Sequence, residues 1–327
     1  MRSAVAAGLI LGIALTLTVA PLRASEKLLV GFPSLATALS PAWATAEHGF
    51  WKKYDLDVEL IYLSGETTIP ALVGGTIQLV IGSDPTTTIA IIKGARLIRL
   101  GVTTNSLGSS LVTHPGVSSV QDLKGKTIGI GSRGYSSLEL RLDQVLREHG
   151  IDTKKDVKFL PISGGPSGRV AALDKRLIAA AMITPPYDLV AEKQGLKILS
   201  NIDVPLLAGG INTTSSFLKD NREVLIRFLK GYMEGIHYMI GHKKETLKAF
   251  SKYLRGVNDT ILSHFYKEIT GRVDKGLRPD SKSVRFLLDF VALEYPQAKG
   301  LTEKDHWDLS LLNEIHDSGF VERLYRK

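Results

Sequence analysis

Short apolar runs alternate with helical patterns along the chain from Lys27 onward. Runs of strand length, such as Leu28–Phe32, are each followed by a helical pattern, and Ser40-Pro41 marks a helix start with serine as the N-cap. This alternation is typical of a parallel sheet with helices on both faces. The predicted strands of this first unit are Leu28–Phe32, Val58–Tyr62, Ile77–Ile81, Leu97–Thr103 and Ser110–Thr113.

The alternation then restarts and predicts a second α/β unit inserted into the first. Its predicted strands are Thr127–Ile130, Val157–Pro161, Ile178–Ile183 and Lys197–Leu199, after which Val204–Thr213 returns to the first unit. We therefore expect an α/β fold in which residues 25–112 and 206–327 form lobe 1 and residues 113–205 form lobe 2.

The last third of the chain, after Ser215, predicts helices only. The clearest helix carries an apolar stripe at steps of three and four residues. We expect this stripe in the core, and it comprises Leu225, Phe228, Leu229, Tyr232, Met233, Ile236 and Met239. Further helices are predicted at about Lys244–Leu254, Asp259–Thr270, Ser281–Tyr295 and Lys304–Asp317.

Residues 1–24 have the pattern of a secretory signal peptide. Arg2 precedes the apolar run Ala4–Ala20, Pro21 follows it, and Ala24 is a small residue before the polar start of the mature chain. The alternative is an uncleaved membrane anchor, for which the apolar run is short. We favour cleavage.

Composition narrows the class of protein. The 327 residues are 44% hydrophobic and 23% charged, which is ordinary for a globular protein. The formal charge of +8 is scattered over helices rather than clustered, so we expect no nucleic-acid partner. The chain has no cysteine, which excludes a thiol nucleophile, a cysteine zinc site and a lipid-anchored terminus. Because the eight histidines also lack metal-binding spacing, we expect no cofactor and no metal. The signal peptide, without a cysteine to carry a lipid, predicts a free periplasmic protein.

Gly129, Gly131 and Gly134 have the Gly-x-Gly-x-x-Gly spacing of a dinucleotide-binding loop. In that motif the first glycine lies in the turn after a strand, and an acidic residue closes the next strand. Here Gly129 falls within the predicted strand, and Ser163 follows the next strand where the acid is required. We therefore predict that these glycines do not bind a nucleotide.

The segment Gly131–Ser137 leads into a predicted helix and is a candidate anion-binding loop. Unpaired N–H groups at a helix start favour an anion, and Arg133 adds a planar, permanently charged group beside Tyr135. Ser136 and Glu139 have the spacing of a capping box. The alternative is therefore an ordinary capped turn with an exposed arginine.

Four segments resemble those of type II periplasmic solute-binding proteins. Gly49-Phe-Trp-Lys-Lys-Tyr-Asp-Leu-Asp-Val-Glu-Leu60 is similar to the family signature "GFFKKYGLDVEL". Pro70–Ser83, Asp122–Gly129 and Val170–Tyr187 resemble three further family segments in the same order. The resemblance is greatest to the branch that binds nitrate, sulfonates, taurine and thiamine precursors.

The resemblance implies a ligand cleft between two lobes, joined by crossovers that we place near Ser110–Gly116 and Asp203–Gly209. In open α/β sheets, ligands lie outside the carboxyl ends of the strands. The candidate ligand-binding residues at those ends are Phe32, Ser34, Leu35, Ser64, Glu66, Thr67, Ser83, Asp84, Ser132, Arg133, Gly134, Tyr135, Ser136, Ser137, Ser163, Thr184 and Tyr187.

Two of these candidates have alternatives, and one departure from the family bears on the ligand. Glu66 is otherwise an exposed loop acid, and Asp84 is otherwise a helix N-cap, which we favour. Where the family often has a tryptophan–acid pair, this chain has Thr184 and Pro185. An acidic partner for a ligand amine is missing there, which argues against taurine or another amine-bearing ligand.

The resemblance implies the substrate-binding component of an ABC import system. Such a protein captures a small organic ligand by hinge closure and delivers it to a permease and ATPase complex in the inner membrane. We expect an anionic, sulfonate- or carboxylate-like ligand, and a monomer that is not an enzyme. The alternative is an enzyme on the same fold acting on a small heterocycle or organic acid. A receptor's sensory domain would need a membrane span or an effector domain, and we expect neither.

Overall fold

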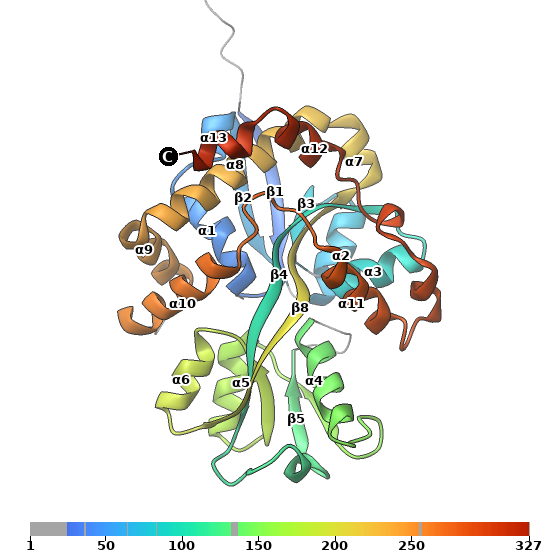
Figure 1. The fold of residues 1–327 in the computed structure, drawn as a ribbon, viewed down its shortest axis with the longest axis vertical. Helices are drawn as coiled ribbons and strands as arrows, with labels where there is room; N and C mark the ends of the chain where they lie inside the picture. Colours follow the sequence, from blue (N-terminus) through green and yellow to red (C-terminus); the bar gives the residue numbers. More distant parts are fainter. Residues whose placement is uncertain are drawn as a thin grey trace, which may run out of the picture.

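The computed structural model describes residues 25–326 apart from Ala36, Ser64, Ser83, residues 132–136 and residues 255–256. It has two lobes, and two long strands, β4 (Leu97–Thr113) and β8 (Lys197–Thr214), run from one lobe into the other (Figure 1). The predicted signal peptide lies outside the described residues. No helix in the described part of the chain combines the length and the apolar character that a bilayer crossing requires.

Lobe 1 is built on three parallel strands. β1 (Glu26–Phe32) lies between β2 (Leu56–Tyr62) and β3 (Leu79–Ile81), and β3 pairs with β8 in the antiparallel direction. One group of helices covers one side of this sheet: α1 (Ser40–Glu47), α8 (Arg222–Gly241), α9 (Lys243–Tyr253) and α10 (Asp259–Arg272) (Figure 1). A second group covers the other side: α2 (Gly65–Val73), α3 (Asp84–Ile92) and α11 (Ser281–Val291). Three short helices lie at the outer end: α7 (Ser215–Asp220), α12 (Ser310–Asp317) and α13 (Phe320–Tyr325).

Lobe 2 repeats this plan on a smaller scale. β5 (Thr127–Ile130) lies between β6 (Lys158–Pro161) and β7 (Ala180–Ile183) and is parallel to both, and β7 pairs with β4 in the antiparallel direction. Its helices are α4 (Ser137–Glu148), α5 (Gly165–Asp174) and α6 (Tyr187–Lys193). The strand order is β2-β1-β3-β8-β4-β7-β5-β6, which confirms the predicted α/β class with a second unit inserted into the first.

The two crossing strands differ from the prediction. We expected each of them as two short strands, but β4 and β8 are continuous and pair with each other through the whole joint between the lobes. The apolar pattern fades at Asn105, Ser106 and Gly108, which are only half-buried because they pass between the two cores. Ladder hydrogen bonds keep this stretch extended without an apolar face. The lobe boundaries at 112/113 and 205/206 stay a prediction, since both strands pass through the joint without a break.

Some helix ends were also predicted wrongly. Ser40 is not the N-cap of α1: a short 3-10 turn (Thr37–Leu39) precedes the helix, and the Ser40 hydroxyl donates a hydrogen bond to the Thr37 carbonyl at 2.8 Å. The same helix ends at Glu47 rather than at Trp51, because the chain turns at Gly49, where φ is +69°. The last predicted helix begins at Ser310 rather than at Lys304, after a separate 3-10 turn (Glu303–Asp305).

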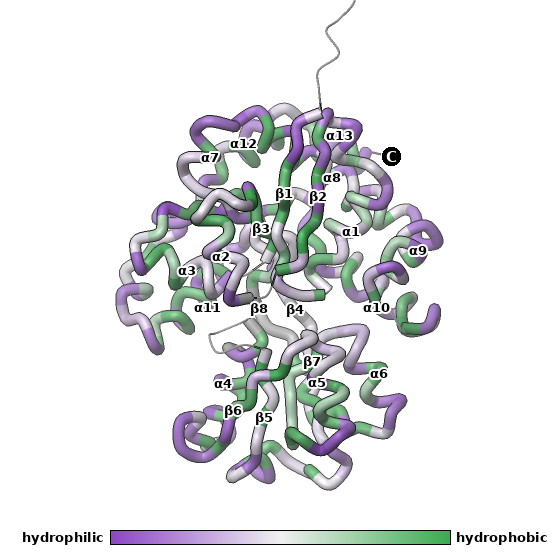
Figure 2. Tube along the Cα trace, turned by 180° about the vertical axis from the view of Figure 1, so that it is seen from behind, coloured by the Kyte–Doolittle hydropathy of each residue, from purple (hydrophilic) through white to green (hydrophobic). Residues whose placement is uncertain are grey.

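The stripe predicted on the long C-terminal helix forms the core of lobe 1. All seven of its residues are buried on α8. Trp51 stacks on Phe228 with ring centroids 5.1 Å apart, and its Nε1–H donates to the Phe228 carbonyl at 3.0 Å. Figure 2 shows hydrophobic stretches along β1 and β3 inside lobe 1 and hydrophilic turns at the outer ends of the molecule. Residues 49–60, which resemble the family signature, therefore contribute Trp51 to the core of lobe 1.

Candidate functional site

Strand directions bring the carboxyl ends of both parallel sheets to the joint between the lobes. β8 runs from lobe 2 into lobe 1, and β3 is antiparallel to it, so β1, β2 and β3 all run toward lobe 2. β4 runs the opposite way, and β7 is antiparallel to it, so β5, β6 and β7 all run toward lobe 1. The loops that follow these six strands therefore face one another, which is where an open α/β sheet binds its ligand.

In lobe 1, five described candidates lie at or after the ends of β1 and β2, and a sixth, Asp84, follows β3. Phe32 is buried and meets Tyr62 edge to face, with ring centroids 5.7 Å apart, while Tyr62 is 54% exposed. Ser34 and Leu35 follow Phe32 and are half-buried. The first turn of α2 holds two more candidates, Glu66 and Thr67, both exposed. The exposed ring of Tyr62 is an apolar surface that the sequence analysis did not single out.

In lobe 2, Tyr187 is the best-defined candidate. It begins α6 and is 7% exposed, and burial raises the pKa of its phenol while a hydrogen bond with Ser167 opposes this shift. Thr184 is fully buried, and its hydroxyl has no hydrogen-bond partner among the described residues. Ser163 is exposed, and Ser137 begins α4.

The predicted anion-binding loop is not described apart from its two ends. Ser132, Arg133, Gly134, Tyr135 and Ser136 lie outside the described residues, as do Ser64 and Ser83 in lobe 1. The role of these seven candidates therefore stays a prediction.

A buried arginine lies under the first residue of that loop. The Gly131 N–H donates to Glu139 Oε1 at 2.5 Å, so the Glu139 carboxylate caps this end of the loop. Arg169, which is 6% exposed, donates from Nε to the Met182 carbonyl at 3.1 Å. Burial lowers the pKa of Arg169, and the nearby Glu139 carboxylate opposes this shift. A Cβ at residue 131 would lie 3.2 Å from Arg169 Nη1 and 3.3 Å from Glu139 Oε1, so a side chain here would crowd both groups.

Gly129 lies within β5, as the sequence analysis predicted. A Cβ at this position would lie 2.3 Å from Ile178 Cδ1, so the glycine permits close packing inside lobe 2. Gly129 and Gly131 therefore both lie close against side chains of lobe 2, and Gly134 lies outside the described residues.

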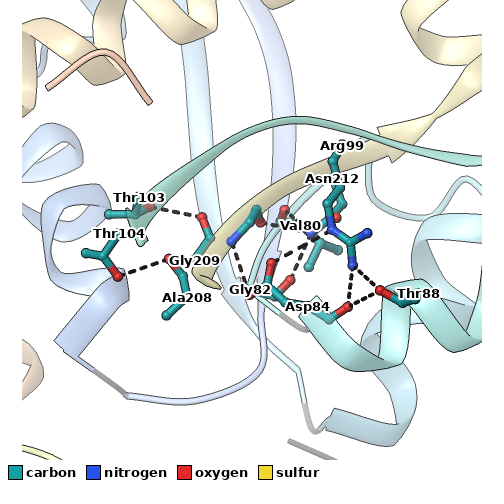
Figure 3. Close-up of polar contacts among 11 residues, drawn as sticks. Val80, Gly82, Asp84, Thr88, Arg99, Thr103, Thr104, Ala208, Gly209 and Asn212 are labelled. Carbon is teal, nitrogen blue, oxygen red and sulfur yellow. Dashed lines mark hydrogen bonds and ion pairs between the residues drawn. The ribbon is translucent and has the colours of Figure 1, made fainter. Parts of the chain in front are cut away.

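The Asp84 carboxylate lies inside lobe 1, bound to β8 and beside Arg99. Its carboxylate is 3% exposed, accepts a hydrogen bond from the Gly210 N–H at 3.3 Å, and lies 3.9 Å from the Nε of Arg99 (Figure 3). Burial raises the pKa of Asp84, and the Arg99 guanidinium opposes this shift. It begins α3 but points back to β8, so we do not count it among the ligand contacts.

One direct hydrogen bond joins the lobes at residues the sequence analysis missed. The Thr37 hydroxyl, after β1, donates to the Pro185 carbonyl, after β7, at 2.7 Å, and both residues are buried. Thr37 follows a strand end and could have been selected by the same rule as Ser34. A small hydroxyl residue in a loop gives no signal of its distant partner, so the sequence around Thr37 does not reveal this contact.

A small cavity beside this contact contains residues from both lobes. Its walls are Thr37, Ala38, Thr104, Ser106, Gly108, Pro185, Glu268, Ile269 and Arg272, and its volume is about 10 Å³. That is about the space one water needs. Arg272 donates to Ser106 Oγ at 3.3 Å and to Glu268 Oε2 at 3.2 Å, so α10 supplies a charged pair to the joint. No sequence signal placed this C-terminal helix there.

A larger furrow, of about 670 Å³, lies on lobe 1 alone between α9 and α10. It is lined by Lys243, Asp259, Thr260, Ser263, His264, Tyr266, Lys267 and Thr270. None of the predicted ligand loops borders it, and it is an open surface feature, so we do not treat it as the ligand site. Within the described residues, no cluster of three or more histidines and carboxylates is arranged to hold a metal ion.

Two lobes joined by two long antiparallel strands, with strand ends facing one joint, define the periplasmic-binding-protein fold. The chain matches the family model described as NMT1/THI5 like over residues 37–246, and it therefore belongs to this family. No curated protein sequence matches the chain.

Solved structures share the fold at low sequence identity. A protein of Bordetella bronchiseptica RB50 is 19% identical with a TM-score of 0.75, over 90% of this chain and 98% of that one. The alkanesulfonate-binding protein SsuA of Xanthomonas axonopodis pv. citri, bound to MOPS, is 19% identical with a TM-score of 0.68, over 84% and 94%. The desulfurization enzyme DszB is 14% identical with a TM-score of 0.65, over 90% and 99%. The same fold thus serves a binding protein and an enzyme.

Proposed function

We propose that this protein is the periplasmic substrate-binding component of an ABC import system. The observation that supports it most directly is the joint: strand ends of both lobes face each other there, and β4 and β8 are the strands that connect the lobes. A ligand held between such lobes stabilises the closed arrangement in proportion to its preference for that arrangement over the open one. The closed form would then be recognised by a permease and ATPase complex.

The ligand in this proposal is a small organic anion of the sulfonate or carboxylate type. The SsuA structure with MOPS shows that a protein of this fold holds a sulfonate. Arg133 and the amides up to Ser137, at the start of α4, are the proposed anion contacts, and Tyr62 and Tyr187 the proposed walls for the organic part.

A thermal-shift screen tests this directly. The screen compares MOPS and other sulfonates, aliphatic and aromatic carboxylates, nitrate and pyrimidines. A ligand at one hundred times its dissociation constant stabilises the folded state by about 2.7 kcal/mol. For a hit, Arg133→Ala should weaken binding by about 1.5–3 kcal/mol, the range for a hydrogen bond to a charged group. An unchanged affinity would contradict the anion site.

The same screen separates binding from catalysis, because DszB shows that an enzyme can have this fold. Each hit is incubated with the protein and analysed by mass spectrometry. A recovered, unaltered ligand supports the transport role. A product whose amount grows with protein concentration and time would show that the protein is an enzyme and would overturn the transport role.

A further inference from the structure

Asp84 and Arg99 form a buried pair behind the wall of the proposed cleft. Asp84 follows the loop that ends β3, and Arg99 lies on β4 and is fully buried. The Arg99 Nη2 donates to the Asp84 carbonyl and, at 2.9 Å, to Thr88 Oγ1 on the next turn of α3 (Figure 3). Arg99 therefore holds the first turn of α3 through its backbone, a hydroxyl and the Asp84 carboxylate.

The loop before Asp84 is held to β8 from its other end. The Gly82 N–H donates to the Gly210 carbonyl at 2.8 Å, and the Asn212 side-chain amide donates to the Gly82 carbonyl at 2.8 Å. With the Asp84 carboxylate on the Gly210 N–H, both ends of the loop at residues 82–84 are bound to the same short piece of β8 (Figure 3).

That piece of β8 is a bend that only glycine permits. At Gly209 φ is +75°, and a Cβ there would lie 2.7 Å from Thr103 Oγ1 and 2.9 Å from the Ala38 carbonyl oxygen. A Cβ at Gly210 would lie 2.0 Å from Asp84 Oδ1. The loops after β1 and β3 thus both press against β8 at these two glycines, since Ala38 belongs to the first loop and Asp84 to the second.

The network reaches one of the three places where the pairing register between the crossing strands shifts. Thr103 Oγ1 donates to the Gly209 carbonyl at 3.0 Å, and Thr104 Oγ1 to the Ala208 carbonyl at 3.4 Å. The next register pair is Ser106 with Pro205, after a shift in pairing. On the other side of this shift lies the part of β8 that comes from lobe 2, so the contacts at residues 208–210 set the direction in which β8 enters lobe 1.

We propose that Asp84 and Arg99 are positioning residues of the ligand cleft. They bind the first turn of α3 to the bend at Gly209–Gly210, which fixes together the lobe 1 side of the cleft at this helix start and the path of β8 through the joint. Ligand contact at this helix start is thereby coupled to the angle between the lobes. The coupling to a ligand rests on the proposed function, whereas the effect on the angle does not.

The angle is measured without ligand, by electron-spin distance measurements between the lobes. Because the chain has no cysteine, Val73→Cys on lobe 1 and Leu177→Cys on lobe 2, both exposed, supply the only two labelling sites. In this background Asp84→Asn keeps the shape of the side chain and removes its charge. We expect the distribution of distances to broaden and its mean to shift, since the Gly210 N–H and Arg99 lose their charged partner. A distribution equal to that of the parent protein overturns the proposal.

Arg169→Met is the matched control. Arg169 is also a buried arginine, and the partners named for it above, Met182 and Glu139, lie within lobe 2. We expect it to lower the unfolding midpoint while leaving the distance between the lobes unchanged. If it broadens the distribution as much as Asp84→Asn does, the effect is general loosening and the proposal is wrong. Should Asp84→Asn not fold, Thr88→Val removes only one acceptor of Arg99 and gives the same test in milder form.

MOPS binding, followed by calorimetry, supplies the second readout. If MOPS binds the parent protein, Asp84→Asn should weaken its binding about tenfold or more although Asp84 is buried behind the wall. Arg99→Lys, which keeps the positive charge beside Asp84, should weaken binding less than Arg99→Met does. Unchanged affinity with an altered distance distribution removes the coupling from the proposal. If MOPS does not bind the parent protein, the proposed ligand class is in question, and the distance measurement still decides the role of the pair.

Discussion

Each lobe holds a buried arginine and an acid behind its cleft loop, but the two pairs connect to different things. In lobe 2, Glu139 in the first turn of α4 accepts from Gly131 eight residues earlier, and its neighbour Arg169 donates to Met182 in the same lobe. In lobe 1, Asp84 in the first turn of α3 accepts from Gly210, which lies on the strand that arrives from lobe 2.

The difference shows that the same arrangement of an acid and an arginine behind a loop has different structural consequences in the two lobes. Both acids lie in the first turn of a helix, where a carboxylate is favoured by the helix dipole. Both accept a hydrogen bond from a backbone N–H, which belongs to a loop residue in lobe 2 and to strand β8 in lobe 1. The acid of lobe 1 meets a residue 126 positions later in the sequence, next to the joint between the lobes. Glu139 and Arg169 hold the start of a loop within lobe 2. Asp84 and Arg99 hold a helix start in lobe 1 and also contact the strand that joins the lobes.

The largest expected effect is that of leaving Asp84 without its cation. Arg99→Met should destabilise the protein by about 3–5 kcal/mol, the usual cost of breaking a buried ion pair from one side. Adding Asp84→Asn should recover part of this loss, because the uncompensated charge is then gone. Urea unfolding at pH 7 measures both variants.

A surface pair provides the control for this prediction. Arg285 and Asp289 form an exposed pair on α11, so Arg285→Met should cost less than about 1 kcal/mol. If the Arg99→Met single variant and the double variant are equally unstable, the pair is not the source of the loss and the contrast with a surface pair disappears.

The bend in β8 gives the next largest effect. Gly209→Ala should destabilise by about 2–4 kcal/mol, because it adds a left-handed alanine to a close contact with Thr103. Gly150→Ala in lobe 2 is a matched substitution, since φ is +74° there and no atom lies within 4 Å of the added Cβ. It should cost only about 1–2 kcal/mol. If denaturant unfolding shows the same loss of stability for both variants, the close contacts at Gly209 add nothing to the cost of a left-handed alanine.

Acid should weaken lobe 1 through a histidine beside the same arginine. Burial, with help from Arg99, lowers the pKa of His306 from 6.5 to about 4, and the ring is fully buried. The folded state therefore resists protonation more than the unfolded state, so this contribution to stability is complete above pH 6.5 and is lost as the pH falls toward 4. At pH 5 the loss should be about 2 kcal/mol.

The comparison of pH profiles isolates this effect from other titrating groups. Unfolding free energies are measured from pH 7.5 to pH 4.5 for the parent protein and for His306→Phe. The profile of the variant should be flatter by the stated amount. Parallel profiles would show that His306 titrates normally in the folded protein.

The smallest expected effect concerns the contact between the lobes. Thr37→Val keeps the shape of the side chain and removes the hydrogen bond to Pro185, which should favour the more open arrangement by about 0.5–1.5 kcal/mol. Small-angle scattering of the ligand-free protein should show a larger radius of gyration. Thr246→Val, which removes a hydroxyl bonded within lobe 1, should leave the radius unchanged. The same increase in both variants would assign no special role to Thr37.

The sequence determined the elements whose burial repeats along the chain. The core stripe of α8, the α/β alternation of both lobes and the place of Gly129 within β5 were all predicted, because each depends on residues a few positions apart. The rule that ligands lie at the carboxyl ends of strands also selected Phe32 and Tyr187, whose strand ends the structure brings to the joint between the lobes.

Tertiary structure alone decided what happens between the lobes. The continuity of β4 and β8 depends on ladder bonds to each other and leaves little trace in an apolar pattern. Asp84 has the same local sequence whether it caps a helix, faces a ligand or binds Gly210, and only the approach of β8, 126 residues later, selects the last of these. Local periodicity records which side of an element is buried, and it carries no information about which distant element arrives to bury it.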